Sequence, residues 1–222
     1  MILKIMVIVM NTTEFSKLKM ASRYWLLGMA EHDSSYRQTL RAFEFMLETH
    51  QGLRKDGVTL EAYHQLSIFS MIRAMYKLLD KPSLTLTVCL LHDTYEDYPD
   101  THADLLRMFP EAYNEIVRVS KIREGKKISY DQYFSEMTYC PVTSIVKLVD
   151  RIHNLSTMQG VFSLEKEQKY VDEVNEYFIP MIKKSRRLFP SQESAYELIK
   201  CSMNLLVSSI QFRLNEVSGE PK

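Results

Sequence analysis

The sequence predicts an all-α protein, on the evidence of its turn residues and its apolar spacing. Only 6 glycines and 7 prolines occur in 222 residues, too few for an all-β chain that turns about every ten residues. Apolar residues recur instead at steps of three and four, as on the buried face of a helix. Because no repeat, low-complexity tract or change of composition marks a linker, we expect one helical domain over residues 1–222.

The N-terminal run 1–10 is apolar apart from Lys4. It is too short to span a bilayer, and no small-residue cleavage site follows it. We interpret it as a short strand, a docked terminus or upstream sequence from a misplaced start codon. From Gln38 onward, apolar stripes predict two helices, the first with Leu40, Phe43, Met46 and Leu47 and the second with Ala62, Leu66, Phe69, Ile72, Tyr76 and Leu79.

The middle of the chain contains a short apolar segment between two boundary signals. Lys81 and Pro82 end the preceding helix. The run 84–91 is nearly continuously apolar and predicts a buried helix. Thr101 and Asp104 form a capping-box pattern that opens the next helix.

The C-terminal half predicts three further helices. Residues 125–127 mark a loop, and apolar residues from 142 to 155 predict a buried helix. Two amphipathic helices follow at about 165–189 and 192–214, and the tail 218–222 should be frayed.

Charge and cysteine usage exclude several classes of protein. With 28 Lys+Arg against 28 Asp+Glu, a neutral surface would not be steered toward nucleic acid or an anionic membrane. Three cysteines at wide spacing, with no CxxC pair, predict neither a disulfide framework nor a thiolate zinc site. We therefore expect a protein of the reducing cytoplasm without nucleic-acid or membrane partners, and the sequence leaves its oligomeric state open.

Two acids and a His-Asp pair stand at the end of the apolar segment 84–91. If the helix continues, His92 lies one turn below Glu96 and Asp93 one turn below Asp97. This arrangement suits a divalent metal, with the first pair as ligands and the second close enough to handle the protons of a water. The alternative is a solvated helix terminus, where acids are common.

A second polar group interrupts the buried helix 142–155. Lys147, Asp150 and Asn154 share one face, and a buried carboxylate needs a partner such as a metal. The alternative is an ion pair of Asp150 with Lys147 or Arg151 on a solvated face.

Histidines outside the His-Asp pair complete the set of candidates. His64 alone would be a half-buried structural residue, but in the order His64, His92-Asp93, Asp150 it gives two imidazoles and two carboxylates. Such mixed ligation fits Mn²⁺, Fe²⁺ or Zn²⁺ better than Ca²⁺. We interpret His153 as a packing or capping residue, and His32, His50 and His102 as surface residues.

Several motifs in order resemble those of the HD-domain metal-dependent phosphohydrolases, in particular their (p)ppGpp hydrolase branch of Rel/SpoT-like enzymes and small alarmone hydrolases. The matching pieces are RKDG at 54–57 ahead of His64, LHDTYED at 91–97, Phe109 with EIVRVSK at 115–121, and VKLVDRIHNLST at 146–157. The resemblance covers about residues 38–185 and implies a single HD-type helical bundle, with C-terminal helices that extend to about residue 214.

The resemblance also implies a role for each matching residue. The metal ligands would be His64, His92, Asp93 and Asp150, with Mn²⁺ as the expected ion and Fe²⁺ or Zn²⁺ as alternatives. Glu96 and Asp97 would be the catalytic acids. The nucleotide would be bound by Arg54, Lys55 and Asn154 around the base and ribose, by Thr157 in the lining of the pocket and by Lys121 near the phosphates.

Departures from the family pattern concern the substrate rather than the metal site. Gln65 stands where the family usually has proline, Gln168 and Lys169 stand where arginines are common, and Phe178 lies near an expected tyrosine. The expected function is hydrolysis of the 3′-pyrophosphate of (p)ppGpp, without alarmone synthesis. Two alternatives stay open, a phosphatase acting on another phosphorylated nucleotide such as NADPH and a non-catalytic nucleotide-sensing module.

Overall fold

The computed structural model describes the backbone of residues 2–218 and the side chains of residues 13–217. Within this range the regular structure is helical apart from one two-stranded hairpin, so the predicted all-α class is confirmed. The α-helices are α1 (Ile2–His32), α2 (Tyr36–Thr49), α3 (Glu61–Ala74), α4 (Pro82–Leu91), α5 (Thr94–Asp97), α6 (His102–Met108), α7 (Pro110–Val119), α8 (Tyr130–Thr138), α9 (Pro141–Thr157), α10 (Leu164–Glu173), α11 (Ile179–Leu188) and α12 (Glu193–Ser218).

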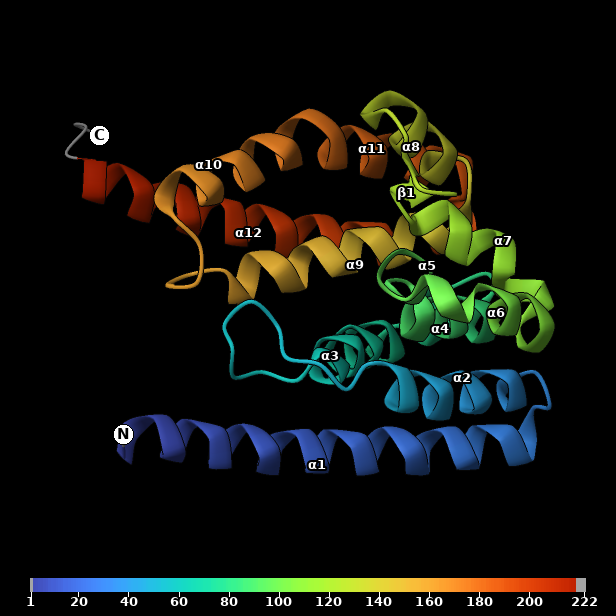
Figure 1. Ribbon diagram of the computed structural model, residues 1–222. Helices are drawn as coiled ribbons and strands as arrows, with labels where there is room; N and C mark the ends of the chain where they lie inside the picture. Colours follow the sequence, from blue (N-terminus) through green and yellow to red (C-terminus); the bar gives the residue numbers. More distant parts are fainter. Residues whose placement is uncertain (1, 219–222) are drawn as a thin grey trace.

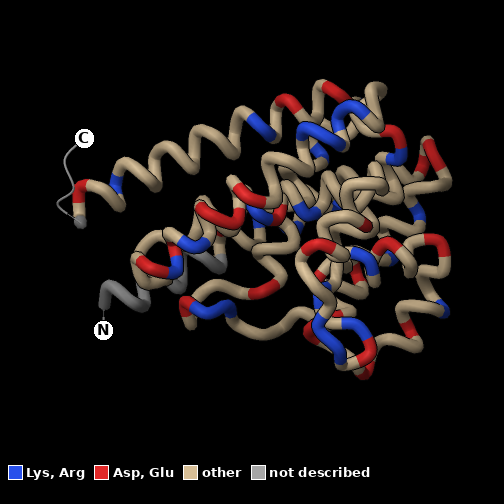
Figure 2. Tube along the Cα trace, turned by 90° about the horizontal axis from the view of Figure 1, so that it is seen from above, with Lys and Arg blue, Asp and Glu red and all other residues tan. Residues whose placement is uncertain are grey.

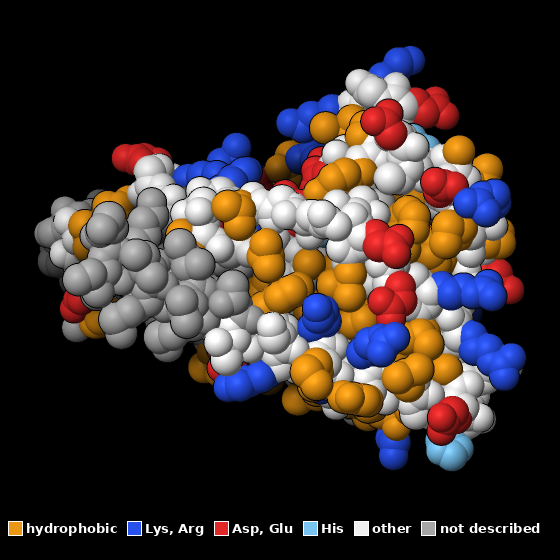
Figure 3. Space-filling view, turned by 60° about the horizontal axis from the view of Figure 1, so that its bottom comes forward, with side chains coloured by type: hydrophobic (Ala, Val, Ile, Leu, Met, Phe, Trp, Pro, Cys, Tyr) orange, Lys and Arg blue, Asp and Glu red, His pale blue; other side chains and the backbone are white. Residues whose placement is uncertain are grey.

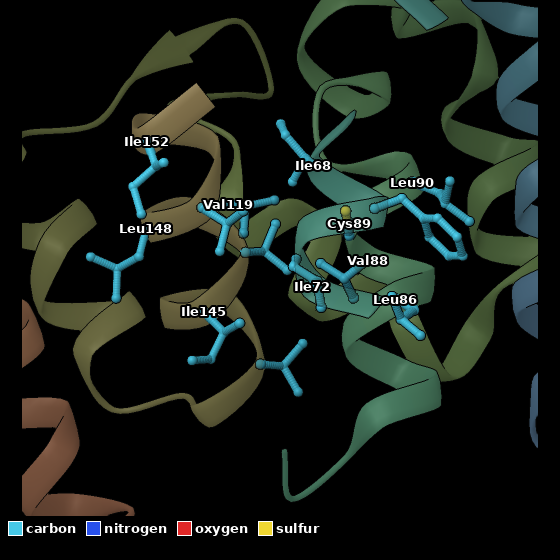
Figure 4. Close-up of a cluster of buried hydrophobic side chains, with 14 of the residues drawn as sticks. Ile68, Ile72, Leu86, Val88, Cys89, Leu90, Val119, Ile145, Leu148 and Ile152 are labelled. Carbon is cyan, nitrogen blue, oxygen red and sulfur yellow. The ribbon is translucent and has the colours of Figure 1, made fainter. Parts of the chain in front are cut away.

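Helix α9 lies at the centre of the molecule. It contacts α3, α4, α7, α8, α11 and α12, and its apolar residues between 142 and 155 are buried, as the sequence predicts. Figure 4 shows Ile145, Leu148 and Ile152 of α9 on one side of the core, with side chains of α3 and α4 on the other. Burial of each large aliphatic side chain contributes about 1.5–3 kcal/mol, so this core fixes α9 firmly and with it the polar residues that α9 carries.

The remaining helices surround this centre. In Figure 1, α1 and α2 run alongside each other below α3 and α4, while α12 runs beside α9 and α10 and α11 lie above it. Lys and Arg are interspersed with Asp and Glu over the described chain, and neither sign is confined to one side (Figure 2). Among the described residues, no helix combines the length and the apolar character that crossing a membrane requires.

The N-terminal apolar run is helical, so its interpretation as a short strand is wrong. Residues 2–10 form the beginning of α1, which continues to His32. A short apolar run cannot be assigned by periodicity alone, and here no glycine or proline occurs before Gly28 to end a helix. Of the predicted frayed tail, residues 219–222 lie outside the described part of the chain.

The predicted loop at 125–127 is the second half of a β-hairpin. Strand β1 (Ile122–Arg123) pairs with β2 (Lys126–Lys127) in antiparallel register. Glu124 and Gly125 connect the strands and both have positive φ, 50° and 73°. A two-residue connection with left-handed backbone matches the twist of a hairpin, which accounts for the pairing of two residues expected to be loop.

Two other boundaries differ from the prediction. Helix α6 begins after Thr101, but the Thr101 hydroxyl donates to the carbonyl of Tyr98, so no capping box forms. The predicted helix 165–189 is divided by a π-helical turn, Val174–Phe178, just before Pro180. A proline has no N–H and collides with the carbonyl four residues earlier in an α-helix, and the wider turn accommodates it.

Helix α1 is attached to the bundle through Trp25. Its ring meets those of Tyr36, Phe69 and Tyr76 edge to face, with centroid distances of 5.7, 6.0 and 5.4 Å. The exposed large apolar side chains of the described part of α1 are Met20 and Tyr24, and Figure 3 shows hydrophobic side chains interspersed with charged ones on this face.

Trp25→Ala should therefore lower the free energy of unfolding by about 2–3 kcal/mol, because it removes three aromatic contacts and leaves a cavity. Urea denaturation measures the change. Tyr24→Ala is the matched control, since this ring is 66% exposed and its loss should cost less than about 0.5 kcal/mol. An equal loss in both variants would contradict the assignment of the contact to Trp25.

Candidate metal and nucleotide site

His92 directly follows the buried helix α4 and lies in the interior of the protein. All residues from Thr85 to Leu91 are buried, and His92 and Asp93 follow in near-helical conformation before α5 begins. The Nδ1–H of His92 donates to the carbonyl of Cys89 at 2.7 Å. A carbonyl can only accept, so this bond places a proton on Nδ1, and in the neutral ring the lone pair is on Nε2.

The four predicted ligands lie together, drawn from α3, the end of α4 and α9. His92 Nε2 lies 3.2 Å from Asp93 Oδ2 and 3.9 Å from Asp150 Oδ1. His64 Nε2 lies 3.7 Å and 3.3 Å from the same two oxygens. Possible donor atoms of His64, His92 and Asp93 all lie within 4.8 Å of one another.

The chemistry of this set fits a divalent cation. His92 Nε2 is buried and has no hydrogen-bond partner among the described residues. Burial acts to raise the pKa of Asp93 and of Asp150, but the neighbouring imidazoles and, at Asp150, Lys147 lower both below the usual range. Two ionised carboxylates therefore face Nε2 of His92, which carries a lone pair when the ring is neutral, and a cation would compensate the two charges and accept that lone pair.

Asp150 is held on both sides. Lys147 Nζ lies 2.8 Å from its Oδ2, and Asn154 Nδ2 donates to its Oδ1 at 2.6 Å. The alternative ion pair with Lys147 thus exists, but on a buried helix face, because Asp150 is only 5% exposed. The alternative pair with Arg151 is absent, since Arg151 binds Glu173 at 2.9 Å.

His153 lies in the site and lines the cavity, so its interpretation as a packing or capping residue is wrong. It is buried, and its Nδ1 lies 2.9 Å from Nδ1 of His64. Burial and the neighbouring His64 lower the pKa of His153 to about 3, so it is neutral. If His64 Nε2 held a cation, His64 Nδ1–H would donate to His153 Nδ1, and this bond would fix the orientation of the His64 ring.

Glu96 and Asp97 lie on α5, beside this cluster. Glu96 Oε2 accepts a hydrogen bond from the backbone N–H of Lys121 at 2.8 Å, which orients its carboxylate. Asp97 is at the exposed rim, yet desolvation by the surrounding protein and the charges of Asp93, Glu96 and Glu61 raise its pKa to about 6. A carboxyl group with such a pKa can exchange a proton near neutral pH.

A cavity of about 470 Å³ opens in front of the cluster. Nine of the predicted residues line it, namely Arg54, Lys55, His64, Asp93, Glu96, Asp97, Asp150, Asn154 and Thr157. Two predicted residues do not. His92 lies behind the wall with its side chain fully buried.

Lys121 is the second predicted residue outside the lining. Its Nζ lies 3.1 Å from the centre of the Tyr130 ring. Burial and the charges of Lys127 and Lys147 lower the pKa of Lys121 to about 8. In this arrangement it contributes to the site through its backbone N–H on Glu96.

The loop between α2 and α3 forms the wall opposite α9. Arg54 Nη2 donates to Asn154 Oδ1 across the cavity at 3.0 Å. The loop is closed on itself, because Arg54 N donates to the Thr59 carbonyl at 2.7 Å and Asp56 Oδ1 accepts from Val58 N and Thr59 N at 2.8 Å each. Gly57 supplies the left-handed turn with φ of 68°.

Sequence reasoning missed Glu61 and His50, which also line the cavity. His50 is 2% exposed, so its interpretation as a surface residue is wrong, and its Nε2 lies 3.0 Å from Thr94 Oγ1. Glu61 accepts a hydrogen bond from the Tyr98 hydroxyl. Its position three residues before His64, on the same helix face, was the available signal.

Asp97→Asn should stabilise the metal-free protein above pH 6. The pKa of Asp97 is about 6 in the folded chain, against its ordinary value of 3.8 in the unfolded chain. The folded chain therefore holds this proton to a higher pH, so the free energy of unfolding falls between about pH 4 and pH 6. Because the side chain is exposed, we expect a gain for asparagine of about 1 kcal/mol.

Thermal unfolding in chelator at pH 4 and pH 7.5 measures this difference. The variant should exceed the wild type at pH 7.5, and the two should converge at pH 4. Asp80→Asn, at an exposed position away from the cavity, is the control. A pH-independent effect of Asp97→Asn would contradict the environment described for this carboxyl group.

Comparison with known proteins gives relatives for about two thirds of the chain. No protein-family model matches it. The chain is 32% identical over 156 residues to a guanosine-3′,5′-bis(diphosphate) 3′-pyrophosphohydrolase of Aquifex aeolicus, which covers 64% of this chain and 20% of the relative. It is 27% identical over 158 residues to the bifunctional (p)ppGpp synthase/hydrolase SpoT of Escherichia coli, covering 67% of this chain and 22% of the relative.

A third relative is a GTP pyrophosphokinase of Streptomyces coelicolor, 27% identical over 155 residues that cover 67% of this chain and 18% of the relative. The chain thus spans about a fifth of the length of the curated relatives it matches. Their names include both hydrolases and synthases. The chain is accordingly related to enzymes of (p)ppGpp metabolism.

Proposed function

We propose that this protein is a metal-dependent hydrolase that removes the 3′-pyrophosphate of (p)ppGpp and releases GDP or GTP. The observation that carries the proposal is the buried, unpaired Nε2 of His92, which faces the ionised carboxylates of Asp93 and Asp150. A solvated helix terminus, the alternative interpretation, would expose the His92 side chain to water instead of burying it. The relatives named as 3′-pyrophosphohydrolases support the choice of substrate.

The metal would be held by His64, His92, Asp93 and Asp150, and Mn²⁺ is the ion we propose, with Fe²⁺ or Zn²⁺ as alternatives. When bound, it would supply Lewis-acid polarisation of the 3′-phosphate and a lowered pKa for water. His153, Lys147 and Asn154 would keep the ligands in place through the contacts described above.

Glu96 and Asp97 would handle protons at the edge of this cluster. Hydrolysis breaks the bond between the 3′-oxygen and phosphorus, adds a hydroxyl group to phosphorus and returns a proton to the 3′-oxygen. Asp97, with a pKa of about 6, would take the proton of the attacking water and pass it on. Glu96, fixed by the N–H of Lys121, would orient that water.

The nucleotide would occupy the cavity between the α2–α3 loop and α9. The guanidinium of Arg54 is planar and can stack on a purine base, and Asn154 already bonds it across the cavity. Lys55 lines the same wall and Thr157 the opposite one. Lys121 would reach the phosphates only if its ammonium group left the Tyr130 ring.

Purified protein with Mn²⁺ should convert ppGpp to GDP and pyrophosphate, and the activity should disappear in chelator. His92→Ala should abolish both turnover and metal retention, because it removes one of four ligands. Product identification by ion-exchange chromatography and metal analysis measure the two effects. His32→Ala, at the exposed end of α1, is the control that should behave as the wild type.

The same nucleotide panel distinguishes the alternatives. Release of orthophosphate from NADPH without turnover of ppGpp would replace the proposed substrate while leaving the metal site. Tight nucleotide binding without any turnover would indicate a sensing module. Full ppGpp hydrolysis in chelator would contradict the metal-dependent reaction itself.

Glu96→Gln should retain Mn²⁺ but lower kcat about a hundredfold or more, because the amide keeps the size of the side chain but its NH₂ group cannot accept the hydrogen bond that would orient the attacking water. Calorimetric titration with Mn²⁺ and steady-state kinetics separate binding from chemistry. Glu111→Gln, on the exposed start of α7, is the matched control. Normal turnover in Glu96→Gln would assign this carboxylate a structural role.

A further inference from the structure

Gln65 is a buried polar residue at the wall of the site that the proposed reaction does not use. It follows His64 on α3, is 1% exposed and lines the cavity. Its Nε2 donates to Oδ2 of Asp93 at 3.1 Å. That oxygen lies 3.2 Å from Nε2 of His92 and 3.7 Å from Nε2 of His64.

The orientation of the Gln65 amide follows from its surroundings. If the amide were turned over, its oxygen would face an ionised carboxylate, so the donor orientation is the favourable one. In that orientation Oε1 is buried and has no hydrogen-bond partner among the described residues. A buried carbonyl without a partner costs stability, so the contribution of Gln65 to folding does not by itself account for an amide at this position.

Proline, the residue expected at this position from the family pattern, does not fit α3 as it is built here. The helix begins at Glu61, so position 65 is in its second turn. A proline there would remove a backbone donor and collide with the carbonyl of Glu61. Position 65 in α3 therefore favours a residue whose backbone N–H can donate to the carbonyl of Glu61, and the glutamine side chain also reaches Asp93.

Asp93 and Asp150 differ in how firmly they are held. Asp150 has Lys147 and Asn154 as side-chain partners and is almost fully buried. The Asp93 side chain is 33% exposed, and the one side-chain donor to it besides the imidazoles, among the described residues, is Gln65. Without this bond its carboxylate could rotate toward the open cavity.

We propose that Gln65 is a positioning residue that keeps Asp93 Oδ2 directed at the two imidazoles, so that the cation site is formed before the cation arrives. One lone pair of this oxygen accepts from Gln65 and the other stays available to the metal. The inference rests on the metal site of the proposed function and not on the identity of the nucleotide. Residues that orient a metal ligand through a hydrogen bond typically change the metal affinity by about tenfold to hundredfold.

The test compares Mn²⁺ affinity in the wild type, Gln65→Met and Gln65→Asn. Methionine keeps the length of the side chain and has no donor, whereas asparagine keeps the amide but is too short to reach Asp93. Gln132→Met is the matched control, because Gln132 also donates to a carboxylate, Glu136, at 2.8 Å, but on an exposed face of α8. Calorimetric titration gives the Kd for Mn²⁺, and thermal unfolding in chelator checks that each variant is folded.

We expect both Gln65 variants to bind Mn²⁺ at least about tenfold more weakly than the wild type and the Gln132→Met control. Turnover of ppGpp in Gln65→Met should fall at limiting Mn²⁺ and recover at saturating Mn²⁺, which a packing defect would not do. Wild-type Kd values in both variants would overturn the proposal, as would a wild type that binds no Mn²⁺. Weakened Mn²⁺ binding in a protein that hydrolyses no ppGpp would support the role of Gln65 while overturning the proposed substrate.

Discussion

The ionised carboxylate of Asp150 lies in the middle of the central helix, where an unpaired charge would cost several kcal/mol. Its partners come from more than one element. Lys147 and Asn154 are one turn away on α9, and His64 reaches it from α3. The packing of α3 against α9 therefore has two effects. The apolar faces exclude water, and the polar side chains of one helix provide partners for the buried charge on the other. This alignment brings His64, Asp150 and Asn154 to the same cavity.

This constraint explains why the polar cluster is so small and so completely organised. His64 is oriented by His153, and His92 by the carbonyl of Cys89. A buried polar network stabilises a single arrangement only when nearly all of its members have partners. The exceptions among the described residues of this cluster are the Gln65 carbonyl and His92 Nε2, and a cation of the proposed site would bind at His92 Nε2.

Much of this could be predicted from the sequence because the relevant signals are periodic. The apolar stripes of α3 and α9 identify their buried faces, and polar residues that interrupt such stripes had to be compensated. The positions of Asp150 and Asn154 on one face follow directly from the helical repeat. The apolar run 84–91 likewise indicated a helix whose end would carry His92 inward.

Side-chain direction was less predictable. His153 follows Asp150 by three residues on α9, so the two side chains lie near each other on the helix surface. The helical repeat does not specify, however, that the His153 ring contacts His64. Lys121 was expected at the phosphates, yet the nearby Tyr130 ring attracts its ammonium group. The short strand, one of three interpretations of residues 1–10, was wrong for a different reason, since an uninterrupted apolar run has no period that separates strand from helix.

The α2–α3 loop has a thermodynamic consequence for any molecule that enters the cavity. The backbone of this loop is already restricted by the hydrogen bonds to Asp56 and by the turn at Gly57. The guanidinium group of Arg54 is restricted by its bond to Asn154. The conformational entropy of this wall is therefore lost when the chain folds and not when a ligand binds. A ligand must, however, share or displace Asn154 as the acceptor of Arg54. Selection among ligands then depends on how well each one reproduces the contact between Arg54 and Asn154, so the side chains of the folded protein themselves define the ligand that fits.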